Sequence, residues 1–207
     1  GLKSRSPAWG DFELAAFRTG TDNEIVTQTN LGGRSTFQNA GSTRRSGLEA
    51  SWVRRYAGDL QARVAATLIE ARFVDVFLTC TAAPCATPNL AIGAGNRIPG
   101  VARGALFGAL TWKPETGWNG GIELRLLSRV AVNDSNSESA PGHGVASAHV
   151  GYVHRVGRWK IAGFVRGDNL LDKRYAGSVI VNEGNGRYYE AAPGRNWLSG
   201  ASAEFRF

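Results

Sequence analysis

Ala201-Ser202-Ala203-Glu204-Phe205-Arg206-Phe207 ends this sequence, with apolar residues at every second position and polar or charged residues between them. Successive side chains of a β-strand point to opposite faces of a sheet, so this stretch predicts a strand with one apolar and one polar face. Residues 60–68 repeat the pattern. So do residues 118–130, where Glu123 and Arg125 alternate with apolar neighbours.

Weaker alternation of the same period fills much of the remaining sequence, and the connections between these segments alternate in length. The other predicted strands are residues 11–20, 42–55, 100–112, 145–156 and 159–168, with residues 1–5 as the stub of one more. The short connections are 6–10, 57–59, 114–117 and 157–158, and the long ones are 21–41, 76–99, 131–144 and 169–196. Bacterial outer-membrane barrels combine short periplasmic turns with long extracellular loops. The predicted fold class is therefore all-β: a partial antiparallel transmembrane β-barrel of eight full strands plus an N-terminal strand stub.

The tryptophans support this orientation. Trp9, Trp112, Trp118 and Trp159 flank short connections, and Tyr56 flanks the remaining one. Aromatic side chains concentrate where the acyl chains of a bilayer meet water, so these residues predict one interfacial ring. On the strands between the two interfaces, we expect charges such as Glu123, Arg125, Glu204 and Arg206 to face the lumen. Their apolar neighbours, which are expected to face lipid, are Ile122, Leu124, Leu126, Ala201, Ala203 and Phe205.

Two elements near the end are more specific than alternation. They are Asp168-Asn169-Leu170-Leu171-Asp172-Lys173-Arg174-Tyr175 and Pro193-Gly194-Arg195-Asn196-Trp197, and the strand that ends in Phe207 follows them. Together they resemble the last hairpin and closing strand of TonB-dependent outer-membrane receptors. In that family a strand ends in an N-L-F-D-K-x-Y-like element, a long loop carries P-G-R, and the last strand ends in Phe. Leu171 replaces the usual Phe.

The resemblance implies that residues 1–207 are the C-terminal part of a receptor barrel, with the plug domain and earlier strands absent from this sequence. It implies a receptor of the bacterial outer membrane that imports a ferric siderophore or similar metal chelate, energised by TonB acting through the missing plug, and not an enzyme. It also implies that Phe207 is the signal that the barrel-assembly machinery reads. One alternative is a small self-contained outer-membrane barrel serving as an adhesin, enzyme or structural protein. A soluble sugar-binding or structural β-sandwich is another.

Composition limits the remaining function classes. The sequence has 207 residues, of which 43% are hydrophobic, and its net charge is +7. The basic residues are spread along the chain and form no nucleic-acid-binding motif, so we expect no nucleic-acid partner. No run of apolar residues reaches the length of a spanning helix. The sequence starts at Gly1 and contains no Met, so we expect a processed chain or a fragment.

The residues that carry reactive or binding chemistry are few. Cys80 and Cys85 flank a loop-like segment and fit a local disulfide formed in an oxidising compartment. His149 and His154 are an odd number of positions apart on one strand and cannot share a metal ion. No nucleophile-elbow sequence occurs. We therefore expect no catalytic residues, no metal site and no cofactor.

Basic and aromatic residues occur together in the long connections. Arginine offers a planar donor fork to anions, and aromatic rings stack on catechol or heterocyclic groups. Such a lining suits an anionic iron chelate, although loop charges of this kind equally suit the phosphates of lipopolysaccharide and outer-membrane lipid. The candidate substrate-binding residues are Arg34, Arg97, Arg174, Tyr175, Arg187, Tyr188, Tyr189 and Arg195.

Overall fold

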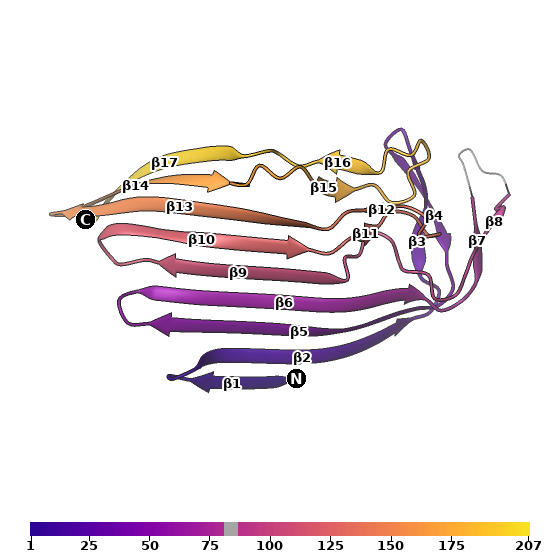
Figure 1. Cartoon of the computed structure of the whole chain (residues 1–207), viewed down its shortest axis with the longest axis horizontal. Helices are drawn as coiled ribbons and strands as arrows, with labels where there is room; N and C mark the ends of the chain where they lie inside the picture. The colour runs from indigo at the N-terminus through magenta and orange to yellow at the C-terminus, as the bar shows by residue number, and fades with distance from the viewer. Residues whose placement is uncertain (81–86) are drawn as a thin grey trace.

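A computed structural model describes residues 1–80 and 87–207, and its main feature is one antiparallel sheet of nine strands (Figure 1). In spatial order the strands are β1 (Leu2–Ser6), β2 (Gly10–Thr21), β5 (Thr43–Tyr56), β6 (Leu60–Phe73), β9 (Gly104–Trp112), β10 (Gly117–Leu127), β13 (His143–Val156), β14 (Trp159–Asp168) and β17 (Asn196–Phe205). Within this sheet, each strand pairs with the sheet strands that come before and after it in the sequence. The prediction of eight full strands plus a stub is therefore confirmed. No helix among the described residues is long and apolar enough to cross a membrane.

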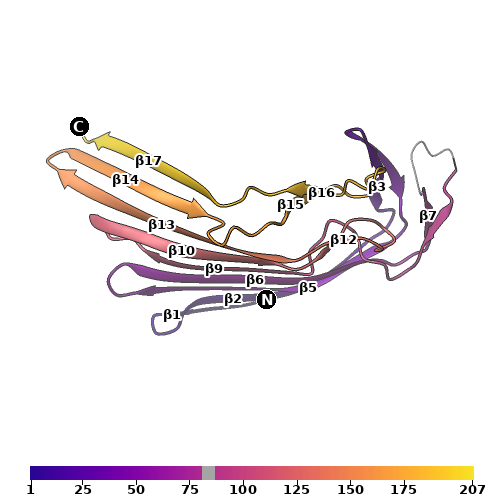
Figure 2. The ribbon, with the colours of Figure 1, turned by 45° about the horizontal axis from the view of Figure 1, so that its top comes forward.

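The sheet is curved and open. Figure 2 shows it as a trough, and β1 and β17 lie at its two edges without pairing to each other in the described part of the chain. The chain thus forms an arc of barrel wall. This geometry favours part of a larger barrel over a closed barrel of eight strands.

Strand register assigns each side chain to one of two faces. Val64, Gly108 and Leu124 lie in one row across β6, β9 and β10, on the outward face. The next row along the strands, which contains Glu123, points inward. Ile122 is 60% exposed and Leu124 is 43% exposed, because the outward face contacts no other part of the described chain. The prediction that Leu124 and Arg125 point to opposite faces is confirmed.

The outward apolar face is as long as a membrane-spanning strand requires. On β6 it runs from Leu60, beside a short turn, to Leu68, and these two residues are eight positions apart. At about 3.3 Å per residue the band measures roughly 26 Å along the strand, and its nine residues match the 9 to 11 or so that a tilted transmembrane β-strand needs. The row of Val64 and Leu124 lies midway along this band.

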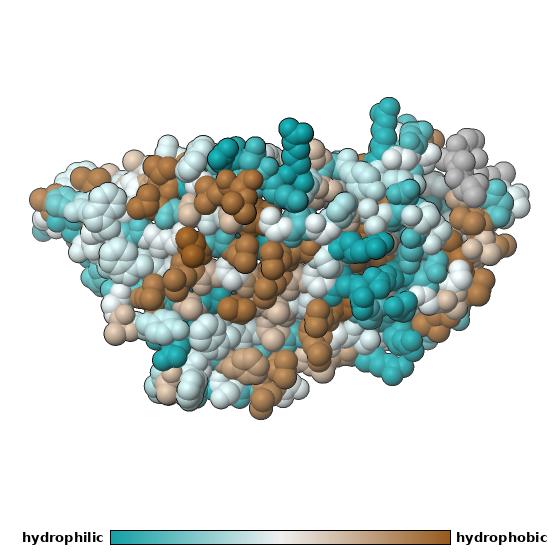
Figure 3. Space-filling model, in the orientation of Figure 1, coloured by the Kyte–Doolittle hydropathy of each residue, from teal (hydrophilic) through white to brown (hydrophobic). Residues whose placement is uncertain are grey.

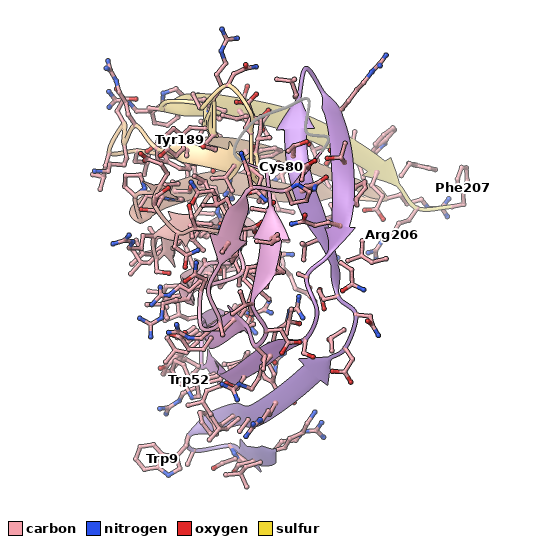
Figure 4. All side chains as sticks on the ribbon, turned by 90° about the vertical axis from the view of Figure 1, so that its right-hand side faces the viewer. Trp9, Trp52, Cys80, Tyr189, Arg206 and Phe207 are labelled. Carbon is pink, nitrogen blue, oxygen red and sulfur yellow. The ribbon has the colours of Figure 1, made fainter. Side chains whose placement is uncertain are left out.

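The predicted aromatic ring lies at the short-turn end of the band. Trp118 is 61% exposed and packs edge-on against Tyr152 of the next strand, with ring centroids 5.1 Å apart. Trp9 and Trp52 lie together on the convex side of the arc (Figure 4), where Trp52 Nε1 donates a 2.8 Å hydrogen bond to the Trp9 carbonyl oxygen. The rings of Trp159 and Phe205 also pack together, tilted by 57° with centroids 5.0 Å apart.

The long connections differ from the prediction, which treated them as loops. Each one contains a small two-stranded hairpin: β3 (Ile25–Leu31) with β4 (Arg34–Asn39), β7 (Phe77–Thr79) with β8 (Leu90–Ile92), β11 (Val130–Ala131) with β12 (Ser139–Ala140), and β15 (Ala176–Val179) with β16 (Tyr189–Ala191). Two predicted strands are also shorter than expected. The strand predicted for 118–130 ends at Leu127, and the one predicted for 100–112 begins at Gly104. The reason is that Val130 and Val101 turn away from the sheet to pack in apolar clusters.

These apolar clusters are the core of the described chain, and both lie at the hairpin end. The first contains Phe73, Phe77 and Ile92, and the second contains Val130 and Val132. The middle of the sheet has no such core because one face meets lipid and the other meets the lumen. The hairpins lean over the concave face, as Figure 4 shows for β3–β4 and β7–β8.

Candidate functional site on the lumenal face and its hairpins

An ion-pair network lies on the lumenal face. Arg166 of β14 donates through both terminal nitrogens to the two carboxylate oxygens of Glu123 on β10, each at 3.1 Å. Its Nε donates to Asp168 Oδ1 at 3.0 Å. Strand β13 lies between β10 and β14, so the Arg166 side chain reaches across β13 to Glu123. Alternation predicted that Glu123 faces the lumen, but only the register shows that Arg166 meets it.

Asn182 ties three of the four hairpin segments together. Its side-chain nitrogen donates to the Thr27 carbonyl oxygen at 2.7 Å and to Asp134 Oδ2 at 2.9 Å. Its backbone N–H donates to the Val132 carbonyl oxygen, and its own carbonyl oxygen accepts from the Asn30 N–H, both at 2.9 Å. The φ of Asn182 is 53°, a left-handed conformation that asparagine tolerates better than most residues. Sequence reasoning missed this residue.

Asn136 makes the corresponding tie to the remaining segment. Its side chain donates to the Arg97 carbonyl oxygen at 2.9 Å and accepts from the Arg97 N–H at 2.7 Å. A side-chain amide that bonds both the N–H and the C=O of one residue makes the two hydrogen bonds that a neighbouring strand would make. The four segments are therefore one connected tier.

A cavity of about 220 Å³ lies within this tier, lined by polar residues that include Thr29, Asp134 and Tyr188. Asp134 is 2% exposed, and its Oδ1 has no hydrogen-bond partner among the described residues. Burial raises the pKa of Asp134 to about 6, and the hydrogen bond from Asn182 opposes that rise. Burial of a carboxylate with one unpaired oxygen favours its neutral form.

The two specific sequence elements contact each other. The Asn169 side chain donates to the Pro193 carbonyl oxygen at 3.3 Å, and Asp172 Oδ1 accepts from the Arg195 N–H at 2.9 Å. A Cβ at Gly194 would lie 2.9 Å from Asp172 Oδ1, so the glycine permits this approach. We call this contact between residues 169–173 and 193–195 the clasp. It closes the base of the last long connection where β14 ends and β17 begins.

The structure does not bring the candidate substrate-binding residues together in one pocket. Arg34 is exposed at the turn of β3–β4. Arg97 lies opposite Arg72, which is on the outward face of β6. The role of Arg97 in substrate binding stays a prediction. Tyr188 is half-buried against the Val130–Val132 cluster and lines the small cavity.

The others lie along the last long connection. Tyr175 stacks on His143, with ring centroids 4.1 Å apart, and the hydroxyl of Tyr189 donates to the Ser139 carbonyl oxygen at 3.3 Å. Both rings therefore have structural contacts. The side chains of Arg174, Arg187 and Arg195 are exposed.

Two further predicted sites are not decided by this geometry. The predicted disulfide involves Cys85, which is outside the described residues, so it stays a prediction. Phe207 is fully exposed and packs edge-on to Phe205, with centroids 5.3 Å apart, and its role as an assembly signal is also still a prediction.

A protein-family model described as TonB dependent receptor-like, beta-barrel matches residues 1–170. The chain belongs to this family. The match includes only residues 168–170 of the first specific element and none of the second, so it rests almost wholly on other parts of the chain. The family places the chain in the outer membrane of Gram-negative bacteria as part of a receptor barrel and not an enzyme.

Solved receptors of this family have the same architecture. The siderophore receptor PiuA from Acinetobacter baumannii superposes with a TM-score of 0.74 at 20% identity, over 95% of this chain and 26% of that one. The ferric yersiniabactin uptake receptor FyuA from Yersinia pestis gives 0.68 at 20% identity, over 99% and 29%. The ferric citrate transporter FecA, unliganded, gives 0.72 at 16% identity, over 95% and 29%. The chain thus spans between a quarter and a third of the length of these receptors.

Proposed function

We propose that this chain is the C-terminal part of the barrel of an outer-membrane receptor that imports a ferric siderophore or a similar metal chelate, with energy supplied through TonB. The family match over residues 1–170 carries the proposal. The similar solved proteins support the substrate class, because they include receptors for ferric chelates of several kinds. The plug, through which TonB acts, and the earlier strands belong to the rest of the proposed receptor.

The charge of the last hairpin segment fits an anionic substrate. Arg174, Arg187 and Arg195 are exposed on one connection, and none of them has an ion-pair partner among the described residues. Free guanidinium groups can therefore donate to carboxylate or catecholate oxygens of a chelate. The tied tier holds this connection in place over the lumen.

Uptake by whole cells tests the proposal. Cells that lack their own siderophore receptors would express the full-length protein, and uptake of radioactive iron would be measured from ferric citrate and from a ferric tris-catecholate. We expect uptake of at least one chelate, and its loss when the inner membrane is de-energised. Replacement of Arg174, Arg187 and Arg195 by Gln should raise the concentration for half-maximal uptake about tenfold or more. Accumulation that continues after de-energisation would contradict TonB coupling, and uptake of neither probe would contradict the substrate class.

A further inference from the structure

The outward face of the sheet becomes basic at its hairpin end. Continuous register places Arg18, Ser46 and Glu70 in one row across β2, β5 and β6, and Arg44 and Arg72 in the row beyond it. Both rows lie on the same face of the sheet as Leu48 and Leu68 of the apolar band. Figure 3 shows the change as teal side chains over the right-hand ends of these strands, beside brown surface over the middle of the sheet.

Two more arginines join this group from the next connection. Arg97 lies directly opposite Arg72 across an isolated bridge, and the Arg103 guanidinium contacts the Glu70 carboxylate. Arg72 Nε donates to Glu70 Oε2 at 3.0 Å. Glu70 thus forms ion pairs with three arginines, Arg72, Arg97 and Arg103. We call Arg18, Arg44, Arg72, Arg97 and Arg103 the outer arginine cluster.

The single carboxylate of Glu70 can neutralise only one of the five positive charges in the cluster. The exposed side chains of Arg18 and Arg44 form no ion pair with any described residue. Arg97 and Arg103 line a hollow of about 930 Å³ together with Leu48, Leu68 and Glu70. Cationic and apolar groups therefore meet at one place, which suits an amphiphile with an anionic head.

The height of the cluster matches the headgroup layer. The apolar band ends at Leu68 on β6 and at Leu48 on β5. Beyond these ends, Glu70 lies two residues from Leu68, and Arg44 lies four residues from Leu48. At about 3.3 Å per residue these groups lie roughly 7 to 13 Å beyond the apolar band. Because the hairpins are on the extracellular side of such barrels, this level is the headgroup region of the outer leaflet.

We propose that the outer arginine cluster binds the phosphate groups of lipopolysaccharide, with the acyl chains of the lipid against Leu48 and Leu68. Arginine forks match phosphate oxygens, and basic residues at a membrane surface are attracted to anionic lipid. The inference rests on the outer-membrane location of the family and not on which chelate the receptor imports. It reassigns Arg97 from the substrate to the lipid.

Lipid binding by the full-length protein, purified from outer membranes in mild detergent, tests the proposal. The probes are bisphosphorylated lipid A, the lipid anchor of lipopolysaccharide, and the same lipid with its phosphates removed. The variant Arg18→Gln with Arg44→Gln removes two guanidiniums that have no ion pair. The matched control is Arg55→Gln with Arg63→Gln, because these two exposed arginines point to the lumen from β5 and β6. Heat-modifiable migration on a gel identifies the folded protein, and binding is measured on that fraction.

We expect Arg18→Gln with Arg44→Gln to raise the Kd for bisphosphorylated lipid A about twenty-fivefold, because each lost cation should cost about a factor of five. The control variant should change it less than twofold, and the dephosphorylated lipid should bind weakly to every form. An equal loss of affinity in both variants would overturn the proposal, as would equal affinity for the two lipids. Displacement by millimolar inorganic phosphate would indicate a site for free phosphate and would also overturn it.

Discussion

At the scale of single residues, neighbours on one strand meet different solvents. Leu124 and Glu123 are adjacent in sequence, yet Leu124 lies on the outward face and Glu123 is bound by Arg166 on the inward face. This part of the structure could be predicted from the sequence, because period-two alternation needs no tertiary information. The partner of Glu123 could not, because it depends on the register of three strands.

Replacement of Leu124 by Arg tests the outward assignment. Leu124 lies in the middle row of the apolar band, so the new charge would sit near the bilayer midplane. We expect it to lower the free energy of unfolding by about 2 to 4 kcal/mol. The measurement is denaturant unfolding of the full-length protein in lipid vesicles. Ala109→Arg is the control, since Ala109 lies opposite Glu123 on the inward face and its replacement should cost less than half as much. An equal cost at both positions would reverse the assignment.

Because Asp134 has a raised pKa, we expect the stability of the hairpin tier to depend on pH. Its pKa is raised from an ordinary 3.8 to about 6 in the folded chain, so the folded state holds a proton that the unfolded state has already released. The stabilisation that this proton gives is therefore fully present below about pH 4, and it is lost as the pH rises to about 6. The loss amounts to about 3 kcal/mol at most.

Hydrogen exchange at the Asn182 N–H, which donates to the Val132 carbonyl oxygen, measures this effect. After correction for the intrinsic rate, its protection should fall between about pH 4 and pH 6.5, and Asp134→Asn should remove that dependence. Protection that stays constant over this range in the unmodified protein would show that Asp134 is not the titrating group.

At the scale of elements, the sequence predicted the long strands and missed the small hairpins. Strands such as β5 and β6 alternate over fourteen residues each, whereas β11 and β12 have two residues each, too few for a period to be recognised. The candidate site was predicted from composition alone. Composition identified the basic loops, but it could not separate Arg97, which faces outward, from Arg174, which is exposed on the last connection.

The clasp at the base of the last connection gives a prediction at this scale. Asn169 is 2% exposed, has a φ of 50°, and bonds both Lys173 and Pro193. Asn169→Ala removes these bonds and strains the backbone, which should cost about 2 kcal/mol of local stability. Trypsin should then cut after Lys173 or Arg174 about thirtyfold faster. Asn185→Ala near the exposed end of the same connection is the control and should leave the rate unchanged. Unchanged cleavage in the Asn169 variant would show that the clasp does not hold this segment.

At the scale of the whole molecule, four features agree on one orientation. The short turns and the aromatic ring lie at one end of the apolar band, while the hairpin tier and the outer arginine cluster lie at the other. In the described part of the chain, β1 and β17 are the two unpaired edges of the sheet. The orientation also places the charged lumenal network between the tier and the short-turn end.

This orientation predicts the depth of Trp118 in the bilayer. Trp118 precedes Leu124 by six residues, which is about 20 Å along the strand from the middle row of the band. In a full-length variant with Trp118 as the only tryptophan, a quencher attached near the lipid headgroup should reduce the fluorescence strongly, and one near the end of the acyl chain should reduce it weakly. The control has its only tryptophan at the Leu124 position, and there the order of the two quenchers should be reversed. If the acyl-end quencher were the stronger one for Trp118, the ring would not be interfacial, and the membrane level assigned to the outer arginine cluster would be wrong with it.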